Sequence, residues 1–495
     1  MNYKSGRRYP LMYEFISKLL ETLGTAIPKA ISDISNVMYS YLLIILLLAV
    51  GLYFTFRTRF VQLRMLKESI RLVTEKSSDK STVSSFQALM VSTASRVGTG
   101  NIVGVANAIA IGGYGAVFWM WIIALVGGAS AFIESTLAQI FKKSDGKGNS
   151  YGGPAYYIQA LMGKRWLGII FAIALIATYA VGFNMLCSFN LVTSLSQYSF
   201  SGDPATSKVP IICGAILAIL VGVCVLGGGK RIAKVASFLV PVMGVAYIAF
   251  ALLTMILNIT SLPAVFAEIF RSAFDFKAIF GGFTGSALMH GIKRGLYSNE
   301  AGVGSAPNAA AAADVSHPVK QGLVQMLSVF IDTLLICTAT AMMCLSSGIV
   351  PSEELSGAPF VQTALAVNFG AFGPYFITFS LLLFAFTTLL GNLFYCEGGL
   401  NYIANRTVSK KTLTIFNLLA CVVIFLGAQL DFGVVWDLSD VLMGIMALIN
   451  LPVIVIMGKP ALAALKDYNK QRKEGKDPVF KASSIGLKQK TDYWN

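Results

Sequence analysis

The residues of this chain with the clearest capacity for chemistry lie in the stretch STASRVGTGNIVGVANAIAIGG, which begins at Ser92. There Arg96 and the glycine-rich run 98–101 interrupt a segment that is otherwise apolar and long enough to cross a membrane. A break at mid-membrane leaves N–H groups that attract a carboxylate and C=O groups that attract a cation. The alternative is a packing motif, in which glycines let two helices approach closely. Close packing does not require the polar Thr99 and Asn101, so the pattern favours a binding site.

A second interruption lies in the second half of the chain. The apolar run 278–292 is short, contains GGFTGS at 281–286, and is followed by Lys293 and Arg294. Five predicted spans, from residue 84 to residue 258, precede it, so it opens a second set of five. Two broken segments at matching positions of two halves are typical of transporters built from inverted repeats, whose binding site lies where the repeats meet.

Composition places both segments in a membrane protein. Of the 495 residues, 55% are hydrophobic and 13% are charged, which is typical of a chain with many membrane spans and not of a soluble enzyme. About 20 residues of helix cross a hydrocarbon core of about 30 Å. The apolar runs predict an all-α, polytopic membrane protein with about 11 transmembrane helices, near residues 37–56, 84–111, 115–141, 166–198, 209–227, 230–258, 278–296, 320–345, 373–403, 411–430 and 437–458.

The net charge is +15, which could suggest binding to nucleic acid. The positions of the basic residues instead indicate on which side of a membrane each connection lies. Basic connections such as KKSDGK, GGGKRIAK and NRTVSKK alternate with connections nearly free of Lys and Arg, such as GGYG and DFGVVWD. This alternation follows the positive-inside rule and predicts an outside N-terminus and a cytoplasmic C-terminus. The basic tail is expected to be solvated and disordered. Apolar positions four apart within residues 11–30 predict a helix on the outer surface.

Other function classes find little support in the sequence. The seven cysteines fall within predicted spans without close pairs, which argues against disulfides and zinc sites, and two histidines alone build no metal centre. A membrane enzyme would need a convergent set of titratable groups, and the charged residues here are scattered. A sensor usually adds a soluble domain, and no predicted loop is long enough to hold one.

Longer blocks of the sequence resemble a known family. The blocks are YFTFRTRFVQLRML, SRVGTGNIVGVA, GAVFWMWIIALVGGASAFIESTLAQ, YGGPAYYIQ and KRGLYSNEAGVGSAPNAAAAADVSHPVKQGL. They are similar to motifs of the alanine or glycine:cation symporter family, which are prokaryotic sodium-coupled amino-acid transporters. The resemblance runs from about residue 53 to 402. It implies a leucine-transporter-type core of ten helices in two inverted repeats, with one extra helix in front.

On this basis the chain divides into five parts. They are an N-terminal extracytoplasmic amphipathic segment (1–36), an extra transmembrane helix with a basic cytoplasmic loop (37–83), inverted repeat one (84–258), inverted repeat two (259–458) and a basic cytoplasmic tail (459–495).

The resemblance implies a sodium site between the first broken helix and the eighth helix of the core. The expected ligands are the carbonyl oxygens of Ala94, Val97 and Phe384 and the hydroxyls of Thr387 and Thr388. Neutral oxygen donors suit Na+, a hard monovalent ion. The alternative for the two threonines is hydrogen bonding to carbonyls of their own helix, as is common for threonines in membrane helices.

The resemblance also implies an amino-acid pocket. The expected residues are Thr93, Gly98, Thr99 and Gly100 for the carboxylate, Phe283, Thr284 and Ser286 for the ammonium group and side chain, and Cys187 and Asn392 for the side-chain pocket. Alanine-type members usually carry glutamine at the position of Cys187 and tryptophan at that of Asn392. An amide in place of an indole makes a larger and more polar pocket, which favours a bigger neutral substrate such as glutamine.

These features predict a secondary active symporter that imports a small neutral amino acid, of the alanine or glycine type or glutamine, coupled to Na+ by alternating access. The expected location is a prokaryotic plasma membrane. Its partners are the amino acid, the sodium ion and the lipid bilayer, and no nucleic acid. A proton-coupled amino-acid transporter is the alternative, and an integral membrane enzyme or a sensor fits less well.

Four charged residues fall within predicted spans, where a charge costs at least about 2.5 to 3.5 kcal/mol and suggests a functional role. They are Arg96, Glu134, Asp332 and Glu397. Glu134 and Glu397 lie near cytoplasmic ends and are expected to pair with loop lysines. For Arg96 and Asp332 two interpretations stay open: an ion pair that closes the inner gate, or a static link between helices.

Overall fold

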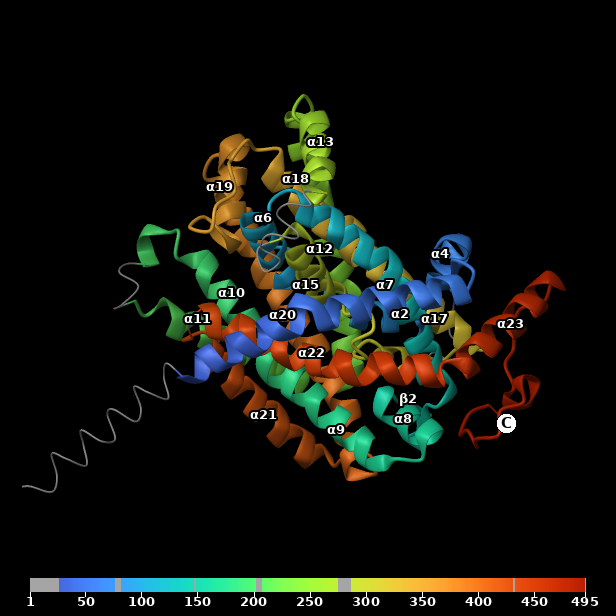
Figure 1. The fold of residues 1–495 in the computed structure, drawn as a ribbon. Coiled ribbons are helices and arrows are strands. Elements are labelled where there is room, and N and C mark those ends of the chain that lie inside the picture. The colour runs from blue at the N-terminus through green and yellow to red at the C-terminus, as the bar shows by residue number, and fades with distance from the viewer. Residues whose placement is uncertain are drawn as a thin grey trace, which may run out of the picture.

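The computed structural model describes residues 26–75, 82–146, 148–201, 207–274, 286–430 and 432–494. Within these ranges the chain is a bundle of helices, with one short antiparallel hairpin of β1 (Lys143–Ser144) and β2 (Ser150–Tyr151). Figure 1 shows α4 and α23 at one end of the bundle, near the C-terminus, and α13 and α19 at another end. The end that carries α4, α23 and the hairpin is called the basic end below.

The first half of the chain supplies the following helices and helical turns: η1 (Met38–Leu42), α2 (Leu43–Arg57), α3 (Val61–Arg64), α4 (Leu66–Val73), α5 (Ser85–Arg96), η2 (Thr99–Asn101), α6 (Val103–Gly112), α7 (Gly115–Ile140), α8 (Pro154–Met162), α9 (Arg165–Ile176), η3 (Ala177–Gly182), α10 (Phe183–Leu195), η4 (Ser199–Ser201), α11 (Val209–Val225) and α12 (Gly229–Leu257). The second half supplies α13 (Leu262–Ala273), α15 (Ala287–Asn299), α16 (Pro307–Ala312), α17 (Pro318–Phe330), η6 (Ile331–Cys337), α18 (Thr338–Leu345), α19 (Gly357–Phe369), α20 (Phe372–Ala404), α21 (Lys410–Gly427), α22 (Phe432–Met457), α23 (Lys459–Lys473) and η7 (Ala482–Ile485).

Eight of these helical stretches are long and apolar enough to cross a membrane: Ala26–Arg57, Gly115–Ile140, Arg165–Leu195, Gly229–Leu257, Pro318–Leu345, Phe372–Ala404, Lys410–Gly427 and Gly433–Met457. The apolar helices Thr99–Gly112 and Val209–Val225 are shorter. Each predicted span therefore coincides with helix wherever the chain is described, and the all-α polytopic fold is confirmed. The total of 11 spans stays a prediction, because part of the span 278–296 lies outside the described residues.

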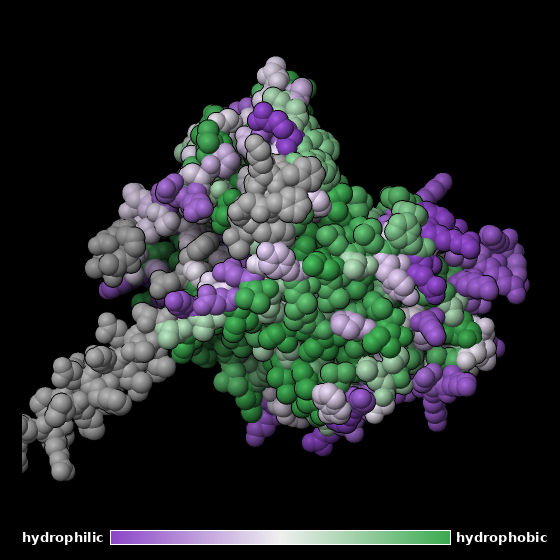
Figure 2. All heavy atoms as spheres, viewed as in Figure 1, coloured by the Kyte–Doolittle hydropathy of each residue, from purple (hydrophilic) through white to green (hydrophobic). Residues whose placement is uncertain are grey.

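The surface explains why such a bundle requires a membrane. Large apolar side chains are exposed along helices far apart in the sequence, for example Ile219 of α11 at 65%, Val245 of α12 at 69% and Leu419 of α21 at 61%. Figure 2 shows a broad hydrophobic surface across the middle of the molecule, with hydrophilic residues gathered at its edges. Water would penalise apolar exposure on this scale, whereas lipid does not.

Close approach of two helices positions the first broken segment. A Cβ at Gly391 of α20 would lie 2.7 Å from the backbone nitrogen of Ser95 in α5. Only a glycine fits at that distance, so α20 lies directly against α5. This contact places the middle of α20 beside the break that follows α5.

The prediction of a disordered tail is wrong. The chain continues as α23, and its aromatic side chains Tyr468, Phe480 and Trp494 are buried at the basic end. The Trp494 Nε1 donates to the carbonyl oxygen of Gln139 at 2.8 Å. The tail was predicted to be disordered because most of its residues are polar or charged. The three buried aromatic side chains nevertheless supply the apolar area that an ordered segment needs.

An electrostatic contact also fastens α23. Burial alone would raise the pKa of Glu68 in α4, but hydrogen bonds from Arg71, Tyr468 and Arg472 lower it to about 2. The carboxylate of Glu68 therefore stays charged at neutral pH and links α4 to α23.

At the other terminus, most of the predicted amphipathic helix 11–30 lies outside the described residues, and helix is described from residue 26.

Candidate functional site

The structure has the predicted break in the first core helix. Ser84 and Gln87 cap the start of α5 with reciprocal hydrogen bonds, which fixes its first turn. The helix ends at Arg96, and Val97 leaves the helical conformation with ψ of 83°. The chain then makes the single tight turn η2 before α6 begins at Val103.

This turn leaves backbone donors available to a ligand. The backbone nitrogen of Gly98 donates to Oδ1 of Asn101 at 2.8 Å, so the Asn101 side chain holds the turn in shape. Among the described residues, the N–H groups of Thr99 and Gly100 have no acceptor, because they are the first of the turn. Such N–H groups bind carboxylates well.

Oxygen atoms gather on the other side of the break. The Thr388 hydroxyl donates to the carbonyl oxygen of Ala94 at 3.1 Å and so joins α20 to α5. The Thr387 hydroxyl instead donates within its own helix, at 3.0 Å to the carbonyl of Leu383 and 3.2 Å to that of Phe384. Of the predicted sodium ligands, Ala94 and Thr388 therefore meet across two helices. Thr387 follows the alternative of bonding to its own helix.

Gly98 fits this contact because it has no side chain. A Cβ at Gly98 would lie 2.2 Å from Oγ1 of Thr388, and a β-branched side chain in a helix has little rotamer freedom to move aside. The neighbouring Val97 is buried, and its nitrogen donates to the carbonyl of Thr93 at 2.7 Å. The predicted donors are all neutral oxygens on two contacting helices, a chemistry that suits Na+.

Polar side chains from other helices reach the same break. The Thr99 hydroxyl lies 3.8 Å from the sulfur of Cys187 and accepts a hydrogen bond from Nδ2 of Asn190 at 3.0 Å. The hydroxyls of Thr93 and Ser328 lie 3.0 Å apart. The structure therefore brings Cys187 of α10 to Thr99. Sequence reasoning missed Asn190 and Ser328, although the three-residue spacing from Cys187 placed Asn190 on the same helix face.

Asn392 connects three helices. Its Oδ1 accepts from the Ser95 hydroxyl at 2.9 Å, and its Nδ2 donates to Oδ1 of Asn184 at 3.0 Å. All three side chains are buried. Asn392 therefore lies between the first broken helix and α10, where a side-chain pocket is expected, and Asn184 is a second buried amide that the sequence reasoning did not single out.

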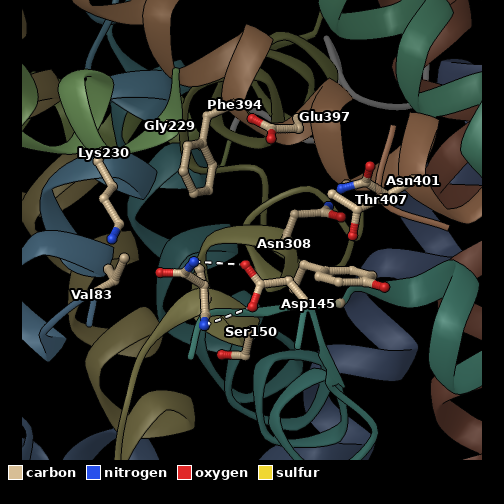
Figure 3. A pocket seen from close by; sticks show the side chains of 15 residues that line it. Val83, Asp145, Ser150, Gly229, Lys230, Asn308, Phe394, Glu397, Asn401 and Thr407 are labelled. Carbon is tan, nitrogen blue, oxygen red and sulfur yellow. Dashed lines mark hydrogen bonds between the residues drawn. The ribbon is translucent and has the colours of Figure 1, made fainter. Parts of the chain in front are cut away.

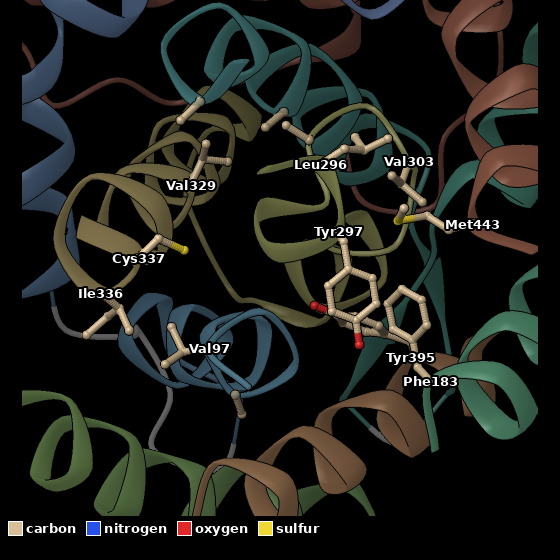
Figure 4. Close-up of a cluster of buried hydrophobic side chains, with 14 of the residues drawn as sticks. Val97, Phe183, Leu296, Tyr297, Val303, Val329, Ile336, Cys337, Tyr395 and Met443 are labelled. Atoms are coloured by element: carbon tan, nitrogen blue, oxygen red, sulfur yellow. The ribbon is translucent and has the colours of Figure 1, made fainter. Parts of the chain in front are cut away.

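Aromatic rings close the break from the side of α15. A Cβ at Gly100 would lie 2.3 Å from the ring of Tyr297, so the ring lies directly on the turn. The ring centroid of Tyr297 is 4.7 Å from that of Phe183 and 5.2 Å from that of Trp436. Figure 4 shows the rings of Tyr297, Phe183 and Tyr395, which come from three different helices, converging beside one another. They exclude water from this side of the turn.

The second predicted break is described only in part. Phe283 and Thr284 lie outside the described residues. Ser286 is buried and caps the start of α15, where its hydroxyl accepts a hydrogen bond from the nitrogen of Met289 at 3.2 Å. This end of α15 lies beside Gly112, at the far end of α6, where a Cβ would be 3.4 Å from Cα of Ala287. The structure therefore does not bring Ser286 to the break at Gly98, and α15 reaches that break only near its other end, at Tyr297.

The carboxylates expected to pair with loop lysines do not do so. Glu134 accepts hydrogen bonds from the nitrogen of Gly302 at 3.3 Å and from Nδ2 of Asn450 at 2.7 Å. Within the described part of the chain, neither Glu134 nor Glu397 forms an ion pair. The prediction for both is wrong. Neutral donors inside the bundle satisfy Glu134, so it does not need a lysine from a loop.

Arg96 and Asp332 do not pair with each other either. The carboxylate of Asp332 accepts from Asn101 at 2.6 Å, Ser298 at 2.7 Å and Thr333 at 2.8 Å. The guanidinium of Arg96 donates to the carbonyl of Gln325 at 3.1 Å. Three neutral donors thus satisfy the carboxylate of Asp332, and Arg96 acts on it only through its charge, without a direct ion pair. The carboxylate is therefore buried next to the break and forms no direct ion pair with a described side chain.

A cavity of about 250 Å³ lies towards the basic end. It is lined by residues of α12, α16, α20 and the β1–β2 connection, including Asp145, Lys230, Asn308 and Glu397. Figure 3 shows these side chains around one hollow, with Glu397 and Lys230 on separate helices. Glu397 follows Thr388 by nine residues in α20, which places it about 14 Å further along the helix axis.

Comparisons with known proteins agree with this architecture. Residues 24–482 match the model of the sodium:alanine symporter family. The chain is 46% identical to the probable sodium/glutamine symporter GlnT of Bacillus subtilis, over 90% of this chain and 91% of that protein. It is 43% identical to the putative sodium/proton-dependent alanine carrier protein YrbD of the same organism, over 94% and 97%. The crystal structure of MhsT in complex with L-phenylalanine matches with a TM-score of 0.56 at 16% identity, over 79% of this chain and 93% of that chain, which shows a leucine-transporter-type fold.

Proposed function

Since this chain belongs to the sodium:alanine symporter family, we propose that it imports a neutral amino acid with Na+ by alternating access and that glutamine is its preferred substrate. Family membership makes it a multi-pass membrane protein that couples amino-acid transport to sodium, and not an enzyme. The observation that carries the proposal is the broken helix at Gly98. On one side of it Thr388 meets Ala94, and on the other side lie the donors of Thr99 and Gly100.

The short distance between these two half-sites supports coupling. The carbonyl side of the break receives Na+, and the N–H side receives the substrate carboxylate. Only the turn from Val97 to Gly100 separates the two half-sites. A ligand that orders this turn at one half-site therefore also orders the binding groups of the other half-site. By linkage, each ligand then raises the affinity for its partner by the same factor.

Buried amides support a polar substrate side chain. Asn184 and Asn392 lie between α5, α10 and α20, and Asn190 reaches Thr99 from α10. An amide side chain such as that of glutamine can exchange hydrogen bonds with these groups, whereas alanine leaves them to one another. One of the relatives, GlnT, is named a probable sodium/glutamine symporter, which agrees with this interpretation.

The cavity at the basic end supports an exit path. Its walls come from α16 and the hairpin on one side and from α12 and α20 on the other. If α12 and α20 separate from α16, a solute released near Thr388 can leave past Asn392 and Glu397. We infer that this hollow is the inner vestibule in a state in which the path is still closed by the aromatic rings around Tyr297.

Uptake in proteoliposomes tests the proposed function. With purified protein and labelled glutamine, an inward sodium gradient should drive accumulation at least tenfold above that in choline buffer. Unlabelled glutamine should compete better than unlabelled alanine or glycine. Equal accumulation with and without sodium would contradict sodium coupling, and stronger competition by alanine than by glutamine would contradict the substrate assignment.

We infer that the protein lies in a prokaryotic plasma membrane with its basic end in the cytoplasm. The basic end carries most of the clustered Lys and Arg, which stay on the cytoplasmic side during insertion. Single cysteines at Ser5 and at the exposed Lys488 report the orientation. A membrane-impermeant maleimide added to intact cells should label Ser5→Cys and leave Lys488→Cys unlabelled until the cells are opened. The reverse pattern would overturn the orientation.

Proton coupling is the second candidate, and one observation favours it. Asp332 is fully buried beside the break, where it accepts hydrogen bonds from three neutral donors and forms no direct ion pair with a described residue. Such a carboxylate can bind a proton or a second cation. The relative YrbD is named a putative sodium/proton-dependent alanine carrier protein. Uptake driven by an inward proton gradient in sodium-free buffer, and lost in Asp332→Asn, would support this candidate.

A further inference from the structure

A second concave surface lies far from the transport site, where α2, α3 and α23 meet at the basic end. Its volume is about 830 Å³. Six basic side chains line it: Arg57, Arg59, Arg64, Lys466, Lys470 and Lys473. One acidic residue, Asp467, also lines it. These six residues and the hollow between them are called the basic groove.

The charge of the basic groove is not compensated within the described chain. None of its six basic side chains forms an ion pair with a described carboxylate. The nearby acids form no ion pair with these six side chains, and Asp467 is the one acid among the lining residues, against six basic ones. Asp467 accepts a hydrogen bond from Gln471 at 2.8 Å and faces His317 at 3.4 Å, and Glu68 holds Arg71 and Arg472. A concentration of positive charge therefore faces outward from one hollow.

Local backbone structure builds this groove. The chain turns sharply after α2, and both Arg59 and Phe60 adopt the left-handed conformation with φ of 55° and 56°. The turn is closed by a hydrogen bond from the nitrogen of Phe60 to the carbonyl of Thr55 at 2.8 Å. Non-glycine residues rarely adopt this conformation, and two in succession are costly. The turn directs the chain from the end of α2 into α3, opposite α23.

Exposed apolar side chains adjoin the groove. Phe56, Phe60 and Leu63 are exposed by 64%, 45% and 63%. They lie in the same turn and helix as Arg57, Arg59 and Arg64. Each short segment thus presents both a basic and an apolar group, an arrangement that matches a lipid with an anionic headgroup and acyl chains.

We propose that the basic groove binds the phosphate headgroup of anionic phospholipids in the cytoplasmic leaflet. Several cations in a concave site attract a phosphate more strongly than the same cations spread over a surface, because their fields add at one point. The adjoining exposed phenylalanines favour a lipid over a free phosphate ion, which would gain nothing from them. The choice of leaflet rests on the proposed orientation, whereas the binding itself does not depend on transport.

Matched charge variants test the proposal. One variant carries Lys466→Gln, Lys470→Gln and Lys473→Gln. Its control carries Lys164→Gln, Lys410→Gln and Lys411→Gln, which removes the same charge from exposed lysines outside the groove. The full-length proteins are reconstituted in nanodiscs of phosphatidylcholine with a minor fraction of phosphatidylglycerol. Native mass spectrometry after detergent release measures the phosphatidylglycerol that stays bound.

Wild type and control should retain phosphatidylglycerol over phosphatidylcholine by at least tenfold, and the groove variant should lose most of this preference. Arg59→Gln, on the opposite wall, should lower it in the same direction. Equal retention by the groove variant and the control would overturn the proposal. Displacement of the bound lipid by millimolar inorganic phosphate would also overturn it, since the groove would then be a site for a free anion. Because the readout is lipid binding, a failure here is distinguishable from a failure of sodium-coupled uptake.

Discussion

Replacing Thr388 by alanine is expected to raise the sodium concentration for half-maximal uptake by about ten- to a hundredfold. The Thr388 hydroxyl is the one predicted side-chain ligand that reaches the other helix, where it meets the carbonyl of Ala94 at 3.1 Å. An interaction of a polar group with a charge contributes about 1.5 to 3 kcal/mol, and about 1.4 kcal/mol corresponds to a factor of ten. Uptake of labelled substrate at fixed concentration and varied sodium measures the shift.

Two variants separate a lost ligand from a general defect. Thr388→Ser keeps the hydroxyl and should stay within a few-fold of wild type. Thr387→Ala removes a hydroxyl that bonds to its own helix at 3.0 Å and 3.2 Å, so its effect should be smaller than that of Thr388→Ala. If Thr388→Ala left the sodium dependence unchanged and reduced only the maximal rate, the hydroxyl would be a packing group and the sodium site would lie elsewhere.

Asn392→Trp is expected to depress uptake of glutamine far more than uptake of alanine or glycine. An indole is much larger than the amide and fills space that a glutamine side chain would use, and it cannot replace the amide oxygen that accepts from Ser95. A buried polar group left unpaired costs about 1 to 3 kcal/mol. The sodium dependence should change little, because Thr388 lies one helical turn away. Competition of labelled substrate by a panel of neutral amino acids measures the change.

Asn392→Leu is the control for volume. It removes both hydrogen bonds without adding much volume, so it should weaken glutamine binding and leave alanine transport nearly intact. If the wild type already preferred alanine and glycine, and both Asn392 variants reduced every substrate alike, Asn392 would be a structural residue. Its two hydrogen bonds, to Ser95 and Asn184, would then serve only to hold α5, α10 and α20 together.

Much of the fold could be predicted from the chain alone, because a bilayer permits few solutions. Backbone polar groups in lipid must be paired within the segment, so each long apolar run has to be a helix. The break at Gly98 was visible for the same reason, since glycines and polar residues in such a run are otherwise costly. The cluster of Thr387 and Thr388 halfway along a span was visible as well, and its threonines fall in α20 as expected.

Partners of individual side chains could not be predicted in this way. The sequence suggested lysines for Glu134, but Gly302 and Asn450 satisfy it from other helices. It suggested a disordered tail, but Phe480 and Trp494 are buried. In each case the deciding contact joins residues that are far apart in the sequence. A local sequence pattern does not show which distant residues will be in contact after folding.

The sequence by itself thus determined the membrane architecture, the location of the first break and the family of the chain. Each of these depends on local composition or on long matching blocks. Only the tertiary structure decided that Thr388 faces Ala94 while Thr387 bonds to its own helix, because two adjacent residues of one helix point about 100° apart. The packing of α20 against α5, made possible by Gly391 at Ser95, selects which of the two hydroxyls reaches the break.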